Sequence, residues 1–244
     1  MKNREASGIG NDVFPAVVFD IDGVLADHSE PVAPAVAEKL VRIAAYARLI
    51  FASGKPAPYL EGLARGLGLE EVILIGENGG VVYFPVSREE YRFDDQIREL
   101  QILAQELKER LKDKVWFQPN QVAVTMFPRQ ETTVADLEKA ARQVLLDMGY
   151  HQMVLYVHED AVDIVPHEMD KGWALDLVAG ILDIQKSSMI VVGNGSNDIP
   201  MIQRAGLSIC IGENEDVVKE ADITFHKVED ALIFILDRLE PDAS

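Results

Sequence analysis

The sequence predicts an α/β protein, a Rossmann-like doubly wound parallel sheet into which a second, α+β domain is inserted. Short apolar runs alternate with helical stripes over residues 12–80 and again over residues 167–240, and paired strand-like runs fill residues 81–166. Strands that alternate with helices are typical of a parallel sheet covered on both faces. We therefore expect a discontinuous core, made of the first two ranges, and an insert made of the third.

The first part of the core is expected to hold three buried strands separated by two helices. Ala16–Phe19, Leu49–Ala52 and Val72–Ile75 are apolar runs that end in turn-forming residues, as buried strands of a parallel sheet do. The intervals between them carry apolar residues at helical spacing. One such stripe begins near Pro34, and the other covers about Tyr59–Leu67.

The insert has a different pattern, in which each helical stripe is followed by two short strand-like runs. The stripes lie within Ile97–Leu111 and Val134–Met148. Only a few residues separate the two runs of each pair, which favours antiparallel hairpins. The pairs are Val115–Phe117 with Val122–Phe127, and Met153–Val157 with Ala161–Val165. This order predicts an αββαββ insert.

The alternation of helix and strand resumes after the insert. A helix is expected after Asp170, and a closing helix over Val228–Leu239. Three further short strands are expected at Met189–Val192, Leu207–Ile211 and Ile223–Phe225. These elements complete the core.

Composition and charge exclude several classes of protein. Lys and Arg number 23 against 41 Asp and Glu, and the formal net charge of −18 repels nucleic acid and anionic membranes. The apolar runs are far shorter than the roughly 18 residues that a membrane-spanning helix needs, and residues 1–11 contain no apolar signal-peptide segment. The single cysteine, Cys210, excludes an internal disulfide. We expect a cytoplasmic protein with neither a nucleic-acid nor a membrane partner.

Polar residues gather where the expected strands end. In an open parallel sheet, ligands bind outside the carboxyl ends of the strands. Three loops at such ends carry unusual polar residues, and Lys171 begins the helix that follows the insert. The loops are Asp20-Ile-Asp-Gly23, Ser53-Gly-Lys55 and Gly193-Asn-Gly-Ser-Asn-Asp198. Their carboxylates, hydroxyl, ammonium and amides could together hold Mg²⁺ and a phosphate.

The two acidic residues of the first loop, Asp20 and Asp22, can share one site. Residues two apart in extended backbone project to the same side. One carboxylate could attack phosphorus while the other, its pKa raised by its neighbour or by burial, protonates the leaving oxygen. Capping of a turn explains the pair equally well, and Ser53, Lys171 and the glycine-rich loop each have ordinary structural explanations when taken singly. The chemistry is indicated by their joint order at strand ends.

This ordered set is similar to that of a known family. Phe19-Asp-Ile-Asp-Gly-Val24, Ala52-Ser-Gly-Lys55, Asp170-Lys-Gly-Trp-Ala-Leu175 and the Gly193–Asp198 loop resemble the four motifs of the haloacid-dehalogenase-like phosphatase superfamily. The αββαββ insert resembles the cap domain of its sugar-phosphate phosphatase branch, near phosphoglycolate, sucrose-phosphate and mannosyl-3-phosphoglycerate phosphatases. The resemblance covers most of the core. It implies Mg²⁺-dependent hydrolysis of a small phosphorylated metabolite, a sugar phosphate or phospho-acid, through an aspartyl-phosphate.

The resemblance also implies roles for the matching residues. Asp20 would be the nucleophile, and Asp22 the general acid and then the base that activates water. Ser53 would bond the phosphoryl oxygens, and Lys171 would neutralise charge. The implied substrate-binding residues are Ser53, Gly54, Lys55, Lys171 and Asn197. The implied metal ligands are Asp20, Asp22, Asn194 and Asp198.

Two positions depart from the family pattern. The fourth motif usually reads GDGxND, and here a neutral amide, Asn194, replaces its first acid. The second motif often carries Thr and then Arg, where this chain has Ser53 and Lys55, which keep a hydroxyl and a charge but lose the bidentate grip of arginine. We expect an altered metal affinity and an altered hold on the substrate.

Two alternative functions stay open. A phosphomutase would share the aspartyl-phosphate but protect it from water. The replacement at Asn194 would also suit a catalytically weakened regulatory protein that binds a phosphorylated metabolite. Zinc chemistry is not indicated, because the histidines show no recognised ligand spacing and are expected at the surface. They include His151, His158, His167 and His226.

Overall fold

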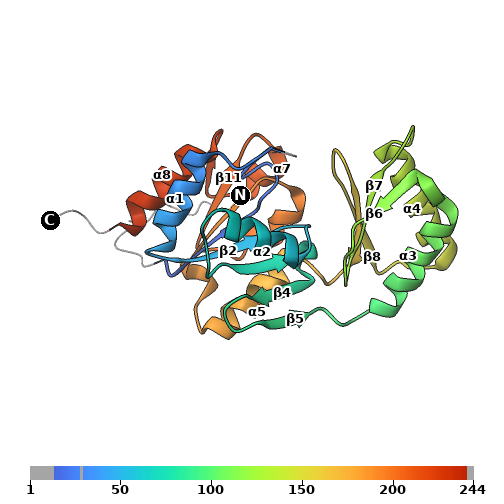
Figure 1. Ribbon diagram of the computed structural model, residues 1–244, viewed down its shortest axis with the longest axis horizontal. Helices are drawn as coiled ribbons and strands as arrows, with labels where there is room; N and C mark the ends of the chain where they lie inside the picture. Colours follow the sequence, from blue (N-terminus) through green and yellow to red (C-terminus); the bar gives the residue numbers. More distant parts are fainter. Residues whose placement is uncertain (1–13, 28–29, 241–244) are drawn as a thin grey trace.

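The chain forms two β-sheets, each with its own helices, in the computed structural model, which describes residues 14–27 and 30–240 (Figure 1). The predicted α/β fold is thereby confirmed. Residues 12 and 13 at the expected start of the core, and residues 1–11, lie outside the described residues. No helix in the described ranges is long and apolar enough to span a membrane.

The larger sheet has eight strands in the order β12-β11-β10-β1-β2-β3-β4-β5. Neighbours from β12 to β3 are parallel, and β4 and β5 are added antiparallel at one edge. The strands are β1 (Ala16–Phe19), β2 (Arg48–Ala52), β3 (Ile73–Gly76), β4 (Val81–Phe84), β5 (Glu89–Arg92), β10 (Met189–Gly193), β11 (Leu207–Ile211) and β12 (Ile223–Phe225). Because β10, β1 and β2 are adjacent and parallel, the loops that follow them open at the same edge.

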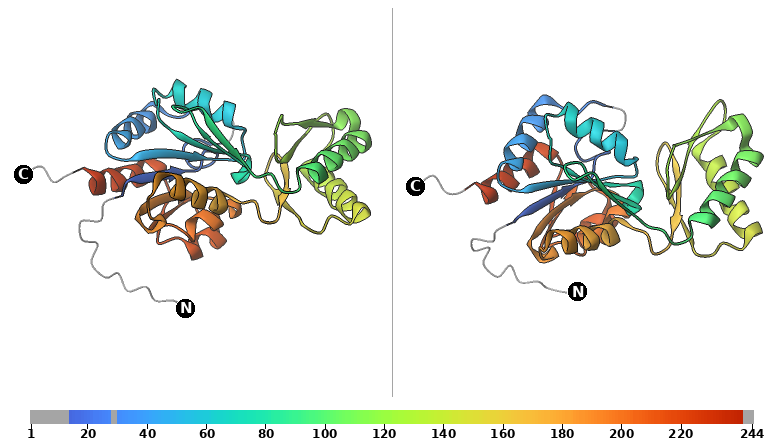
Figure 2. Two further views of the ribbon diagram at one scale, coloured as in Figure 1. Left: turned by 90° about the horizontal axis from the view of Figure 1, so that it is seen from below. Right: turned by 60° about the horizontal axis from the view of Figure 1, so that its bottom comes forward.

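Helices cover both faces of this sheet (Figure 2). Successive strand residues point to opposite faces, so Val17 and Phe19 pack into one hydrophobic cluster and Ala16 and Val18 into another. The first cluster is closed by α1 (Pro34–Ala44), α2 (Ala57–Gly66) and α8 (Val228–Leu239). The second is closed by α5 (Lys171–Leu182), α6 (Ile199–Ile202) and α7 (Glu215–Glu220).

The smaller sheet, with its two helices, is here called the cap and comprises residues 97–166. Its antiparallel strands follow the order β6-β7-β9-β8. They are β6 (Val115–Phe117), β7 (Val124–Pro128), β8 (Met153–Val157) and β9 (Val162–Pro166). The helices α3 (Ile97–Leu111) and α4 (Val134–Met148) pack on the face of this sheet that points away from the core (Figure 1). The other face is turned toward the core.

The inserted domain begins later in the chain than expected. The expected boundary was residue 81, but β4 and β5 belong to the core sheet, where Val81 pairs with Gly76 and Arg92 with Val81. Val81 and Val82 are fully buried against β3, and this burial extends the sheet rather than the cap. The polar strand β5 was not expected because Glu89–Arg92 carries no apolar alternation.

A tight turn between β3 and β4 ties the cap to the core. Glu77, Asn78 and Gly79 have left-handed φ values of 54°, 56° and 107°. The buried carboxylate of Glu77 accepts hydrogen bonds from the backbone N–H groups of Gln121 and Val122 in the cap. These bonds hold a backbone conformation that ordinary residues rarely adopt.

Gly79→Ala should cost more stability than Gly68→Ala. A Cβ at Gly79 would lie 2.1 Å from the carbonyl oxygen of Asp170, whereas a Cβ at Gly68, with a similar φ of 76°, meets nothing within 4 Å. Gly68→Ala should lower the free energy of unfolding by about 1 kcal/mol through backbone strain alone. Gly79→Ala should lower it by about 3 kcal/mol or more, because overpacking is added. Urea unfolding of both variants measures the difference, and equal losses would contradict this account of the turn.

Candidate active site

The site is built around a buried lysine at the start of α5. Lys171 is 0% exposed, and its ammonium donates to Asp20 Oδ1 and to Asp198 Oδ1, each over 2.6 Å. Asp170 caps the helix by accepting from the Trp173 backbone N–H, which fixes where Lys171 begins. Burial opposes the charge, but attraction to Asp198 and Asp20 raises the pKa of Lys171 overall. The lysine is therefore a permanent cation between two carboxylates.

Asp20 follows β1 at the centre of the sheet and is 6% exposed. Burial, the main cause, and repulsion from Asp198 raise its pKa to about 7, against the opposing attraction of Lys171. A cation beside Asp20 would favour its carboxylate form.

Asp198, an expected metal ligand, is bound on both oxygens by other groups of the chain. Its Oδ1 accepts from Lys171, and its Oδ2 accepts from the backbone N–H groups of Asn194 and Gly195 at 2.8 and 2.9 Å. Both oxygens are thus used to hold Lys171 and the loop after β10, and the residue is fully buried. Asp198 therefore positions Lys171 and this loop, and its direct ligation of a metal stays a prediction.

Asn194 lies directly beside the Asp20–Gly23 turn. A Cβ at Gly23, whose φ is 78°, would come within 2.1 Å of the Asn194 side-chain amide, so only glycine allows the two loops to approach this closely. Asp22 completes this group; its Oδ2 is 3.4 Å from the Lys55 ammonium. Two carboxylates, those of Asp20 and Asp22, and the carboxamide of Asn194 therefore line the same cavity.

The expected phosphate-binding loop after β2 is also in place. Ser53 is almost fully buried, and its Oγ accepts from the backbone N–H of Lys55 at 3.2 Å. The Gly54 carbonyl oxygen accepts a hydrogen bond from Gln118 Nε2 of the cap at 3.0 Å. Asn197 donates from its side-chain amide to Asn78 Oδ1 at 3.0 Å. All the predicted site residues thus lie at one edge of the core sheet.

Three residues that sequence reasoning did not select complete the site. Asn78 donates to Asp163 Oδ2 over 2.6 Å, and His158 Nε2 lies 3.1 Å from the same oxygen. Asn78 follows β3, so the rule that selected the other strand-end loops would have found it. Asp163 was visible as a lone charge inside the apolar run of β9, where alternation turns it toward the core while Val162 and Ile164 face the cap helices.

His158 corrects the expectation of surface histidines. Its side chain is 30% exposed and contacts the nearly buried carboxylate of Asp163. Burial lowers its pKa, but the hydrogen bond and the charge of Asp163 outweigh burial and raise the pKa above its ordinary value. His226, by contrast, is exposed, as expected.

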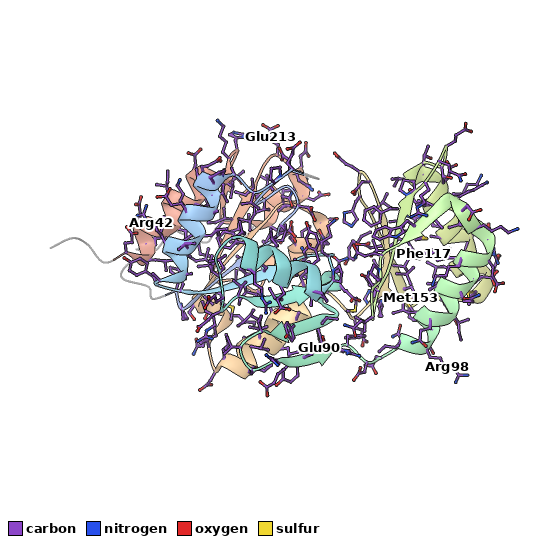
Figure 3. The ribbon with its side chains drawn as sticks, in the orientation of Figure 1. Arg42, Glu90, Arg98, Phe117, Met153 and Glu213 are labelled. Carbon is purple, nitrogen blue, oxygen red and sulfur yellow. The ribbon has the colours of Figure 1, made fainter. Side chains whose placement is uncertain are left out.

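These residues surround a cavity of about 610 Å³ between core and cap. Side chains of the two parts face each other there (Figure 3, where Arg42 and Glu213 mark the core and Phe117 and Met153 the cap). Its floor comes from the core loops, and includes Asp20, Asp22, Ser53, Gly54, Lys55, Asn78, Asn194 and Asn197. Its roof comes from the cap, and includes Gln118, Thr125, Phe127, Val157, His158, Glu159, Asp160 and Asp163. A cavity of this kind suits a small polar ligand.

Residues 105–232 match the family model of the haloacid dehalogenase-like hydrolases. The matched region is more than half of the chain and includes the third and fourth motifs. This protein therefore belongs to the haloacid dehalogenase-like hydrolase family, as the sequence motifs predicted.

Curated relatives match this chain over most of its length and most of their own. The chain is 28% identical over 216 residues to a phosphoglycolate phosphatase of Haloarcula marismortui, covering 84% of this chain and 88% of the relative. It is 26% identical over 211 residues to a phosphoglycolate phosphatase of Archaeoglobus fulgidus, covering 84% and 86%.

Solved structures share the fold. A haloacid dehalogenase-like hydrolase from Bacteroides thetaiotaomicron superposes with a TM-score of 0.73 at 19% identity, over 91% of this chain and 99% of that one. A sugar phosphatase of subclass IIB superposes with a TM-score of 0.65 at 19% identity, over 89% and 95%. Both likenesses extend over core and cap together.

The His158–Asp163 pair predicts a specific pH dependence of stability. Because the pKa of His158 is raised in the folded state, the contribution of the protonated histidine to the free energy of unfolding is complete below about pH 6.5. This contribution is lost as pH rises through the folded-state pKa. His158→Gln should lower the free energy of unfolding by on the order of 1 kcal/mol near pH 6 and by less near pH 8.5. His151→Gln, at an exposed cap histidine, is the matched control and should lack this pH-dependent loss. Thermal unfolding across that range tests the pair, and a loss that grows with pH would refute it.

Proposed function

We propose that this protein is a Mg²⁺-dependent phosphatase that hydrolyses a small phosphorylated metabolite through an aspartyl-phosphate on Asp20. The observation that carries the proposal is the buried Lys171 ammonium, which lies between Asp198 and Asp20, the carboxylate that lines the cavity floor. A buried cation beside a strand-end carboxylate suits a reaction in which negative charge develops on a transferring phosphoryl group.

In the first step, an Asp20 carboxylate oxygen attacks phosphorus and the bond from phosphorus to the leaving oxygen breaks. Lys171 favours the ionised form of the nucleophile, against the effect of burial, and neutralises charge as it spreads over the phosphoryl oxygens. Ser53 and the backbone around Gly54 supply hydrogen bonds to those oxygens, and Lys55 adds charge from the cavity floor. Asn197, held by Asn78, closes the opposite side.

Asp22 moves the proton in both steps. Its side chain is partly exposed and lines the cavity, so it can reach a leaving oxygen above Asp20. As an acid it protonates the leaving group, and as a carboxylate it then takes a proton from the water that attacks the aspartyl-phosphate. Phosphate is released and the Asp20 carboxylate is restored.

The donor chemistry fits a magnesium ion. Among the described residues no group of three or more His, Cys, Asp or Glu is placed to hold a metal. The ligand set proposed here instead combines two carboxylates with neutral oxygens. Mg²⁺ accepts such a set and keeps several waters. Asp20, Asp22 and Asn194 would hold the ion, which would supply positive charge to the phosphoryl oxygens and to Asp20. Asp198 supports this group through the Asn194 backbone.

The relatives support the reaction class and leave the substrate open. Phosphoglycolate phosphatases and a sugar phosphatase share the family or the fold, and their substrates are all phosphomonoesters. We therefore infer a phosphomonoester substrate for this chain.

Asp20→Asn should leave a folded protein with background turnover, because an amide is a poor nucleophile at phosphorus. Asp22→Asn should lower kcat by about 10²- to 10⁴-fold, the usual contribution of a general acid. Asp183→Asn, the same change at an exposed helix end, should keep full activity. Phosphate release from an aryl phosphate with Mg²⁺ measures all three, and near-normal turnover by Asp20→Asn would exclude the covalent mechanism.

Asn194→Asp should lower the Mg²⁺ concentration needed for activity. A neutral amide replaces part of the attraction that compensates for stripping water from the ion, and an acid would restore it. Titration of Mg²⁺ against initial rate, for the parent protein and the variant, gives the half-saturating concentration. An unchanged or raised value would mean that the site is adapted to one less negative charge.

A further inference from the structure

The roof of the cavity is unusually acidic for a site that binds a phosphate ester. The turn between β8 and β9 supplies Glu159 and Asp160, and β9 supplies Asp163. The cap contributes no lysine or arginine to the described lining, and its one basic group is His158. The part of the substrate that lies beyond the phosphoryl group therefore faces carboxylates.

The basic groups near this roof are already paired. His158 contacts Asp163, and the Lys55 ammonium lies 3.4 Å from Asp22. Within the described residues, neither Glu159 nor Asp160 forms an ion pair. An anionic leaving group would thus meet a net negative charge from the roof, where three carboxylates face one histidine.

A separate observation concerns the hydrogen bonding of Asp163. The residue is only 3% exposed, and its Oδ2 receives both Asn78 and His158. Its Oδ1 is buried and has no hydrogen-bond partner. A buried carboxylate oxygen without a donor is costly, and the side chain lines the cavity. Asp163 therefore has an unused acceptor position at a residue that lines the cavity.

An aromatic ring on the same surface also favours a cation. Phe127 lines the cavity, and the Lys55 ammonium already lies 5.6 Å from its ring centroid. Aromatic faces attract ammonium groups through the ring quadrupole. Carboxylates beside an aromatic ring are a suitable lining for an organic ammonium.

We propose that the cap roof selects a leaving group that carries an ammonium, so that the substrates are phosphate monoesters of amino alcohols or amino sugars. This inference rests on the proposed phosphatase function. The ammonium donates to Asp163, after a rotation of its carboxylate, and is attracted by Glu159 and Asp160. The carboxylate of phosphoglycolate, the substrate named for the curated relatives, is repelled by the same groups.

Three two-carbon substrates that differ chiefly in charge test the proposal. They are O-phosphoethanolamine, 2-hydroxyethyl phosphate and 2-phosphoglycolate, whose leaving groups are cationic, neutral and anionic at about pH 7.5. Measured as kcat/KM with saturating Mg²⁺, the order should be cation, neutral, anion. The cation should exceed the anion by about tenfold or more, and the ratio should shrink as salt is added.

Matched charge removal identifies the residues responsible. The double variant Glu159→Gln with Asp160→Asn should lower the cation-to-anion ratio by about threefold or more. The double variant Asp113→Asn with Glu131→Gln removes the same two charges at exposed cap positions outside the cavity and should keep the ratio. Asp163→Asn should lower the ratio as well, with thermal unfolding as the check that the variant is folded.

The outcomes separate this inference from the proposed function. Hydrolysis of 2-hydroxyethyl phosphate with no preference for phosphoethanolamine, or with a preference for phosphoglycolate, would overturn the ammonium subsite and leave the phosphatase standing. A preference unchanged by the Glu159 and Asp160 variant and by Asp163→Asn would equally overturn it. Release of phosphate from none of the three substrates, nor from an aryl phosphate, would overturn the proposed function and the subsite with it.

Discussion

The ammonium of Lys171, buried between Asp20 and Asp198, is the interaction on which the site depends. Three charges inside a protein are tolerated only when each is paired and hydrogen-bonded. Here one lysine joins the end of β1 to the loop after β10, and Asp198 extends the network to the backbone of that loop. The geometry of the reacting carboxylate is thus fixed by the same contacts that offset the cost of burying it.

The parallel sheet provides the frame for this network. Because β10, β1 and β2 are adjacent and parallel, the loops that follow them lie next to one another at the carboxyl ends of the strands. The insertion of the cap between β5 and α5 has a further effect. The chain returns from the cap at Pro166 and reaches Asp170, the N-cap of the lysine-bearing helix, within a few residues.

The core elements and the main site residues could be predicted from sequence because each depends on local pattern. Apolar runs mark strands, and polar residues at their ends mark the loops that face a ligand. The antiparallel β5 could not be predicted, since Glu89–Arg92 is polar and is held only by its pairing with β4. The position of Asp198, the burial of His158 and the contact of Asn78 with Asp163 depend on three-dimensional neighbours that no spacing reveals.

The hydrogen bonds from Asp163 through Asn78 to Asn197 limit how freely the two parts of the protein can diverge. Roof residues such as Glu159 and Asp160 form no hydrogen bond with the floor within the described part of the chain, so exchange of the cap would alter them without disturbing the chemistry below. Asp163 is different, because it shares Asn78 with a loop of the floor. A transplanted cap that lacks an acceptor at this position would leave Asn78 and Asn197 unsupported. A cap exchanged into this protein therefore needs a residue at position 163 that is compatible with Asn78.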